Sequence, residues 1–283
     1  MSEAAPASGG QGPIVFSHAN GFPAGTYRLL FEAWRDAGFE VRAVEKIGHD
    51  ARYPVSDGWP HLRDELIDFA ARAGNGAPVW LVGHSLGGYL SAMAASHRPA
   101  LARGVVLLDS PILGGALAHG VGFFKATGWA QRWSPGRVSQ RRRERWPSAE
   151  AAQAHFAAKP AFARWAPEVL GDYVASGVWP ADGGAGTGHA LAFDRDVETA
   201  IYDTLPHRLD RQLRLHPLHC PLAFVGGRQS SETRRVGLRA TARHARGRIV
   251  WIDGTHLFPF ERPAETAAAV LGWLRRFERG SAA

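Results

Sequence analysis

The 283-residue sequence has little of several features that would place it in a particular class of protein. Cys220 is its single cysteine, so no disulfide can form within the chain, which favours a reducing, cytoplasmic location. No apolar run is long enough to cross a membrane. Metal-ligand spacing is also missing, because the histidine pair at 216–219 has no third ligand beside it. Neither a membrane partner nor a metal or other cofactor is therefore expected.

Lysine is scarce as well. The formal net charge is +7, yet arginine supplies nearly all of the positive charge. Such a bias, beside abundant alanine and glycine, is typical of a GC-rich coding background, so no nucleic-acid partner is expected. The run from Arg141 to Arg145 is the one dense basic cluster, interpreted either as a solvated helix face or as a patch that attracts an anionic substrate or partner. The only lysines among the 33 basic residues are Lys46, Lys125 and Lys159.

The rest of the composition is typical of a globular protein. Hydrophobic residues make up 45% of the chain and ten residues are tryptophan, which is enough for a well-filled core. Residues 1–13, MSEAAPASGGQGP, are small and polar instead. They have neither the basic start nor the apolar middle of a secretory signal, and we expect a disordered tail.

Apolar segments with strand character alternate with amphipathic segments of helical period over most of the chain. The strand segments are nearly continuous in apolar residues, which predicts a parallel sheet covered by helices on both faces. Right-handed crossovers then give a mostly parallel, doubly wound α/β fold. The predicted strands are 12–18, 39–46, 77–84, 102–111, 221–227 and 247–254, and the predicted helices are 26–38, 59–74, 85–99, 231–245 and 262–279.

The alternation is interrupted between residues 112 and 207. This stretch is rich in glycine, arginine and tryptophan and holds helical pieces at 149–159 and 197–205. The simplest architecture is an α/β core made of 14–111 and 208–283, with an inserted helical cap or lid at 112–207. A cap over the edge of such a sheet walls a pocket, so its aromatic residues predict a largely apolar substrate. The candidate substrate-binding residues in the cap are Trp129, Trp133 and Trp165.

One pentapeptide in the core carries the pattern of a nucleophile. Residues 83–87 are Gly-His-Ser-Leu-Gly, with an apolar strand before them and a helical pattern after them. A strand that turns sharply into a helix presents the middle residue, Ser85, at the tip of the turn, and the turn requires small neighbours on both sides. The N-terminus of the following helix favours negative charge at the same place. The alternative is a serine that only caps this helix.

A nucleophilic serine needs a base and donors for an oxyanion. The chain has 13 histidines, so position must select among them. His256 follows the last predicted strand, and its loop should lie over the same C-terminal edge of the sheet as Ser85. The N–H of Leu86, directly after the serine, is the first candidate oxyanion donor. The N–H of Phe22, in the loop after the first strand, is the second.

Three segments taken together resemble the α/β-hydrolase superfamily. SHANGFPAGTYR is similar to its oxyanion loop, LVGHSLGGYLSAMAA to its nucleophile elbow, and GTHLFPFERPAETAAAVLGWL to its histidine loop with the last helix. The resemblance covers residues 14–110 and 221–279, and the cap fits as the usual insertion. It implies an α/β-hydrolase fold, a Ser-acid-His triad in that chain order, and hydrolysis of an ester or other acyl bond. The layout is nearest to epoxide hydrolases and haloalkane dehalogenases, whose aspartate nucleophile is replaced here by Ser85, so their activities are not carried over.

The resemblance leaves the acid of the triad open. The family usually places it after the first strand beyond the cap, where this chain has the uncharged Gln229 or Ser230. Glu232, slightly further along, is long enough to reach back. Asp109 ends the strand before the cap, where haloalkane dehalogenases carry their acid, and it is slightly preferred because it closes an apolar strand at the active edge. Each also has a structural explanation, Asp109 as a cap of the next turn and Glu232 as a first-turn helix residue.

The resulting hypothesis is a serine hydrolase that cleaves an ester or related acyl bond of a small, largely apolar substrate through an acyl-enzyme. Ser85 attacks the carbonyl, His256 takes its proton, and Asp109 or Glu232 orients the histidine. A C–C bond hydrolase or an acyltransferase on the same scaffold is the alternative within enzymes. A non-catalytic homologue that binds a small ligand is the alternative outside them. The serine and histidine argue against that alternative, and the lack of the usual acid argues for it.

Overall fold

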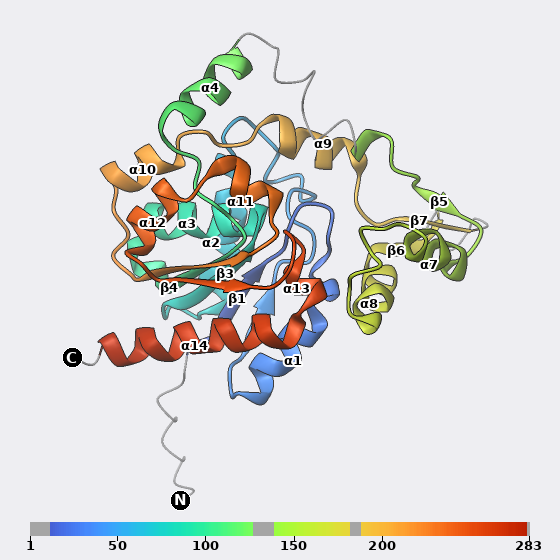
Figure 1. The fold of residues 1–283 in the computed structure, drawn as a ribbon, viewed down its shortest axis with the longest axis horizontal. Helices are drawn as coiled ribbons and strands as arrows, with labels where there is room; N and C mark the ends of the chain where they lie inside the picture. The colour runs from blue at the N-terminus through green and yellow to red at the C-terminus, as the bar shows by residue number, and fades with distance from the viewer. Residues whose placement is uncertain (1–11, 127–138, 182–187, 282–283) are drawn as a thin grey trace, which may run out of the picture.

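The computed structural model of the protein describes residues 12–126, 139–181 and 188–281. The tail expected at 1–13 therefore lies almost entirely outside the described residues. At the centre is a six-stranded sheet in the order β2-β1-β3-β4-β8-β9, and every neighbouring pair of strands is parallel (Figure 1). The predicted parallel α/β architecture is confirmed. The strands are β1 (Ile14–Ser17), β2 (Val41–Ala43), β3 (Val79–His84), β4 (Ala102–Leu108), β8 (Leu222–Gly227) and β9 (Ile249–Ile252).

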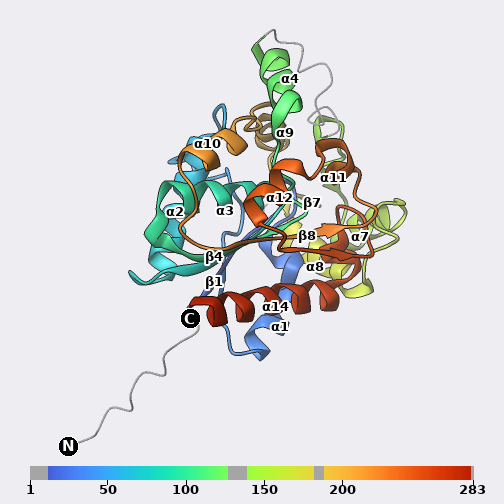
Figure 2. The same cartoon turned by 60° about the vertical axis from the view of Figure 1, so that its left-hand side comes forward.

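Helices cover both faces of this sheet, as a doubly wound fold requires. The first and last long helices, α1 and α14, lie together on one face, and α2, α3 and α12 lie on the other (Figure 2). Among the described residues, no helix is both long and apolar enough to cross a membrane. The helices of the core are η1 (Ala24–Tyr27), α1 (Arg28–Asp36), α2 (Pro60–Ala73), α3 (Leu86–His97), η2 (Pro99–Leu101), α10 (Leu209–Leu215), α11 (Ser231–Val236), α12 (Arg239–Ala245), α13 (Phe258–Glu261) and α14 (Pro263–Ser281).

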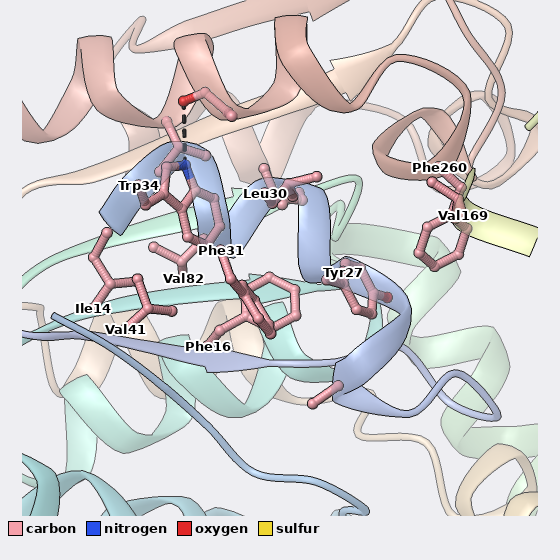
Figure 3. Close-up of a cluster of buried hydrophobic side chains, with 14 of the residues drawn as sticks. Ile14, Phe16, Tyr27, Leu30, Phe31, Trp34, Val41, Val82, Val169 and Phe260 are labelled. Atoms are coloured by element: carbon pink, nitrogen blue, oxygen red, sulfur yellow. Dashed lines mark hydrogen bonds between the residues drawn. The ribbon is translucent and has the colours of Figure 1, made fainter. Parts of the chain in front are cut away.

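Alternate residues of the buried strands enter two separate apolar cores, because successive side chains of a strand point to opposite faces. In β1, Phe16 belongs to the core shared with α1 and α14, and Val15 belongs to the core shared with α2 and α3. Trp34 of α1 is fully buried in the first core, and its indole N–H donates to the Ala267 carbonyl of α14 at 3.3 Å (Figure 3). This bond ties the first helix to the last.

The single helix predicted at 231–245 is broken into α11 and α12. The break falls at Gly237, whose φ of +74° is left-handed and costs glycine little. The buried residues Thr233 of α11 and Ala240 and Thr241 of α12 keep helical spacing across the break. Periodicity alone therefore gave no sign of it.

The segment between β4 and β8 is not wholly helical. It also contains a three-stranded antiparallel sheet in the order β5-β7-β6, which lies with α7 and α8 to one side of the core (Figure 1). Strands this short show no alternating pattern in a sequence, so they were not predicted. The elements are α4 (Gly115–Ala126), β5 (Arg145–Trp146), α7 (Ala149–Ala157), α8 (Pro167–Gly177), β6 (Val178–Pro180), β7 (His189–Leu191) and α9 (Arg195–Asp203).

The C-terminal ends of the central strands meet at one edge of the sheet. Gly83 of β3 is level with Ser17 of β1 on one side and with Leu107 of β4 on the other. The loops that follow β1, β3 and β4 are therefore neighbours in space. This is the edge at which open α/β sheets bind ligands.

Candidate active site

Ser85 lies at a sharp turn between β3 and α3. Its backbone has φ 52° and ψ −112°, a conformation that residues other than glycine rarely adopt. The turn is tight enough that a Cβ on Gly83 would collide with the backbone of Gly87, and a Cβ on Gly87 would collide with the Ser17 carbonyl. The Ser85 N–H donates to the Leu108 carbonyl at 3.0 Å, which fixes the turn against the end of β4.

His256 meets Asp109 at this edge. Asp109 directly follows β4 and is fully buried, whereas His256 belongs to the loop between β9 and α13 and its side chain is 19% exposed. His256 Nδ1 lies 2.7 Å from Asp109 Oδ2, so the Nδ1–H donates to the carboxylate. This hydrogen bond leaves Nε2 as the nitrogen able to accept a proton.

Asp109 is itself held by donors from the loop after β8. Its Oδ1 accepts from the Gly227 N–H at 2.9 Å and from the Thr233 hydroxyl at 3.1 Å. Its Oδ2 accepts from the Ser230 hydroxyl at 2.5 Å as well as from His256. Both oxygens of Asp109 therefore accept hydrogen bonds from two donors each. One side-chain ligand atom from each of Asp109, Glu232 and His256 lies within 4.8 Å of the other two. Sequence reasoning missed these donors, and its only signal was the Ser-Ser-Glu-Thr run after β8.

Glu232 lies beside this pair. The hydrogen bonds described for its carboxylate go to serine hydroxyls and not to the His256 ring. Its Oε2 accepts from the Ser231 hydroxyl at 2.9 Å and, more weakly, from Ser230 at 3.4 Å. Burial by itself lowers the pKa of His256. The hydrogen bond and charge of Asp109 and the charge of Glu232 outweigh burial, and the pKa of His256 is raised above its ordinary value. Asp109 therefore contacts the histidine, and Glu232 acts on it only through its charge.

The two predicted oxyanion donors differ in their surroundings. The Leu86 N–H, at the start of α3, donates to no acceptor among the described residues. The Phe22 N–H donates to the Ala19 carbonyl at 3.1 Å. This hydrogen bond must become bifurcated or break before the Phe22 N–H can donate to an oxyanion. The Gly87 N–H donates to the His18 carbonyl at 3.2 Å and holds the loop after β1 against the helix start.

Comparison with known proteins identifies the family to which this fold and edge belong. Residues 14–269 match the family model described as the alpha/beta hydrolase family. The chain belongs to the alpha/beta hydrolase family. The resemblance stated from the sequence is therefore confirmed, and the matched range also includes residues 112–207.

The relatives of this alpha/beta hydrolase fall into two sets. Human monoglyceride lipase is 33% identical over 106 residues, which are 35% of this chain and 35% of that protein, so the match spans about a third of the curated relative. The solved structure of E-2-(acetamidomethylene)succinate hydrolase has a TM-score of 0.69 at 22% identity, covering 94% of this chain and 92% of that one. The thioesterase domain of the curacin biosynthetic pathway has a TM-score of 0.65 at 18% identity, covering 92% and 91%. At these identities the two structures establish the fold alone.

A chain of buried hydrogen bonds runs through the elbow of the hydrolase. The Ala19 N–H donates to the Tyr27 hydroxyl at 3.1 Å, and this hydroxyl donates to His84 Nδ1 at 2.7 Å. His84 Nε2–H then donates to the His256 carbonyl at 2.9 Å. Burial and the nearby His256 hold the pKa of His84 well below its ordinary value, so His84 stays neutral and its tautomer is fixed. The chain joins the loop after β1 to the histidine loop.

The basic run Arg141–Arg145 lies next to the loop after β1 through Arg142, whose Nη1 would be 3.0 Å from a Cβ on Gly21. Residues 141–144 are irregular and lead into β5, so the run does not form the helix face considered from sequence. Arg142 turns inward, and its guanidinium donates to both oxygens of the buried Glu198 at 2.8 Å and to the Tyr173 hydroxyl at 2.8 Å. The amide of Asn20 donates to the Glu198 carbonyl at 2.9 Å, and a Cβ on Gly21 would press against the Arg142–Glu198 pair. This pair therefore holds the segment between β4 and β8 against the candidate oxyanion loop.

The aromatic residues proposed for substrate binding have different outcomes. Trp165 is 7% exposed and packs against Phe162, Tyr173 and Phe260 in an aromatic cluster that also receives Phe22. Through Phe22 and Phe260, Trp165 joins the segment between β4 and β8 to the α/β core. Trp129 and Trp133 lie outside the described residues.

Proposed function

We propose that this alpha/beta hydrolase is a serine hydrolase that cleaves an ester or related acyl bond of a small, largely apolar substrate. The observation that carries the proposal is the 2.7 Å contact of His256 Nδ1 with the buried Asp109, at the strand edge where the elbow presents Ser85. Nucleophilic acyl transfer requires a serine and a carboxylate-oriented histidine together. Here the strained, partly exposed Ser85 and the oriented His256 come from loops at the same edge of the sheet, joined by the bond from His84 to the His256 carbonyl. The match to monoglyceride lipase over about a third of that protein supports an acyl substrate.

In the proposed mechanism, Ser85 Oγ attacks the substrate carbonyl while His256 Nε2 takes the serine proton. The carbonyl oxygen becomes an oxyanion and accepts from the Leu86 N–H, with Phe22 as the second donor once its bond to Ala19 yields. His256 then gives the proton to the leaving alcohol, and the acyl group stays on Ser85. A water molecule attacks the acyl-enzyme, His256 takes one of its protons, and Ser85 leaves with that proton to release the acid. Asp109 stabilises the imidazolium in both halves of the reaction.

Labelling with a fluorophosphonate tests the proposal directly. We expect the probe to add to Ser85, so that the peptide containing residues 83–87 gains the mass of the phosphonyl group. A panel of p-nitrophenyl esters of rising acyl length should be hydrolysed, and preincubation with the best ester should slow the labelling. Heat-denatured protein is the control, because an unfolded chain has no activated serine. An intact protein that neither reacts nor turns over any ester would instead be a ligand-binding homologue.

The hydrogen-bonded chain through the elbow gives a second prediction. Tyr27→Phe keeps the ring but removes the hydroxyl, which leaves His84 Nδ1 and the Ala19 N–H without their partner. We expect kcat for ester hydrolysis to fall about tenfold with little change in KM, because buried groups left unpaired cost about 1–3 kcal/mol and loosen the histidine loop. The ¹⁵N chemical shifts of His84 should lose the signature of a single Nε2–H tautomer.

Tyr89→Phe is the matched control for this variant. Tyr89 is another buried tyrosine, and its hydroxyl donates to the Pro111 carbonyl at 2.9 Å and accepts from the Leu113 N–H at 2.9 Å, without touching His84. It should lose similar stability while kcat changes little. An equal loss of kcat in both variants would mean that general loosening explains the effect, and that Tyr27 has no positioning role.

A further inference from the structure

A second concave site lies at the opposite edge of the sheet from the candidate active site. Its walls come from the loop between α10 and β8, from α12 and from the last turns of α14, all on the side of the core away from the cap (Figure 1). Leu222, the first residue of β8, lines it, whereas Ser85 and Asp109 follow the last residues of parallel strands. Its volume of about 660 Å³ is within the range of small-molecule sites. We call it the distal groove.

The lining of the distal groove is strongly basic. Among the residues that the structure describes, no aspartate or glutamate lines it. Low-dielectric walls around charges of one sign focus the field and attract counter-ions. The basic residues that line it are Arg214, His219, Arg243, His244, Arg246, Arg248 and Arg276.

A single buried carboxylate compensates part of this charge. Asp210 of α10 accepts from Arg243 at 2.8 Å and from His244 at 2.9 Å, and it lies 3.4 Å from Arg214. The two positive charges of Arg243 and Arg214 already exceed the one negative charge of Asp210. Both guanidinium groups also remain about half exposed, with 44% and 56% of their side chains accessible, so they can bind a further anion.

The other three arginines of the groove make no ion pair among the described residues. Arg276 lies over the ring of Trp273, with its Cζ 4.9 Å from the ring centroid, and Arg248 donates to the Ala245 carbonyl at 3.3 Å. Arg246 is exposed at the end of α12 in a left-handed conformation with φ 50°. These contacts hold two of the side chains in place and neutralise none of them.

We propose that the distal groove binds a small ligand carrying two or more phosphate charges. A guanidinium group pairs bidentately with phosphate, and several arginines around one hollow match a polyphosphate better than a single carboxylate. The apolar wall of Pro217, Leu218 and Pro221 gives room for an uncharged part of the ligand. Ser85, Asp109 and His256 do not line the groove. Binding there is therefore independent of the proposed hydrolysis.

Calorimetric titration with two probes, inorganic pyrophosphate and ATP, tests this inference at about 0.15 M salt, where exposed charges are largely screened. We expect saturable binding of at least one probe with one molecule per chain. Arg246→Gln combined with Arg248→Gln should weaken it at least about tenfold, because two phosphate contacts are lost. Pyrophosphate tests binding of the phosphate groups by the arginines. ATP also carries an adenine ring, which tests contact with the apolar wall of the groove.

A charge-matched variant separates a site from general attraction to a basic protein. Arg42→Gln combined with Arg52→Gln removes the same two charges from side chains that are 60% and 71% exposed and lie outside the groove. Binding should change less than about twofold in this control, and thermal melting should show both variants folded. Failure of both probes to bind, or an equal loss in the two variants, would overturn the inference. Ser85→Ala should bind the probes like the wild type.

Discussion

Ser85→Ala is expected to lower kcat for the best p-nitrophenyl ester by up to about 10⁶-fold, the scale seen when a serine nucleophile is removed. The reason is geometric: the elbow fixes one hydroxyl at the C-terminal edge of the sheet, and no neighbouring serine takes its place there. Ser110 follows the next strand, but its hydroxyl donates to the Ser85 carbonyl at 2.9 Å and to the Leu108 carbonyl at 3.0 Å. Steady-state kinetics with the purified variant measures the loss.

The control for this variant is Ser176→Ala on α8. Its hydroxyl donates to the Asp172 carbonyl within its own helix, and the position lies outside the candidate active site. Its activity should match the wild type. Circular dichroism should show that Ser85→Ala remains folded, since alanine tolerates the φ of +52° no worse than serine does. Turnover that survives in Ser85→Ala would exclude the serine mechanism and favour a different nucleophile.

The sequence predicts much of this edge because parallel strands deliver their following loops to one place. Apolar runs mark β1, β3, β4, β8 and β9, and the residue after each run is then a candidate for the site. Ser85 was selected by the Gly-His-Ser-Leu-Gly pattern between a strand and a helix, and His256 by its place after the last strand. The structure brings their loops together through the bond from His84 to the His256 carbonyl. That these two loops lie close together could be predicted from the sequence, because it follows from the parallel topology and not from the details of side-chain packing.

The choice between two acids was not accessible in the same way. β4 and β8 are neighbouring strands, with Leu108 level with Val225, so the loops after them open at one point. A sequence does not reveal which strands are neighbours, and both Asp109 and Glu232 satisfy the rule. The structure adds that Ser230, at the place where the family usually carries its acid, donates its hydroxyl to Asp109. The loop after β8 thus supplies hydrogen-bond donors to an acid carried by β4.

The contact between Arg142 and Glu198 could not be predicted from the sequence, for another reason. Arg142 and Glu198 are far apart in the chain, and only Glu198 belongs to a helix, α9, whereas Arg142 lies in an irregular stretch before β5. Their pairing depends on burial, which leaves Glu198 only 1% exposed and makes an unpaired charge costly. Composition placed a basic cluster in this region, yet only packing decides which of its arginines turns inward.

Asp109→Asn and Glu232→Gln should separate the two acids by a large margin. Asp109→Asn removes the charge that stabilises the imidazolium and allows the amide to favour the wrong tautomer of His256, so kcat should fall about 10⁴-fold. Glu232→Gln removes only a nearby charge from a partly exposed position, and the loss should stay below about tenfold. A comparable collapse in Glu232→Gln, with Asp109→Asn nearly active, would make Glu232 the acid.

The pH profile of the Glu232 variant gives the same test a second readout. His256 must be neutral to accept the serine proton, and its pKa is raised, so kcat/KM of the wild type should fall as pH drops through a value above the ordinary 6.5 of histidine. Because the charge of Glu232 contributes to that rise, Glu232→Gln should move this limb to lower pH and leave the plateau nearly unchanged. Gln229→Ala is the control, since Gln229 bonds to Arg164 and Asp253 instead, and its limb should not move. A limb that stays in place in Glu232→Gln would show that Asp109 alone sets the basicity of His256.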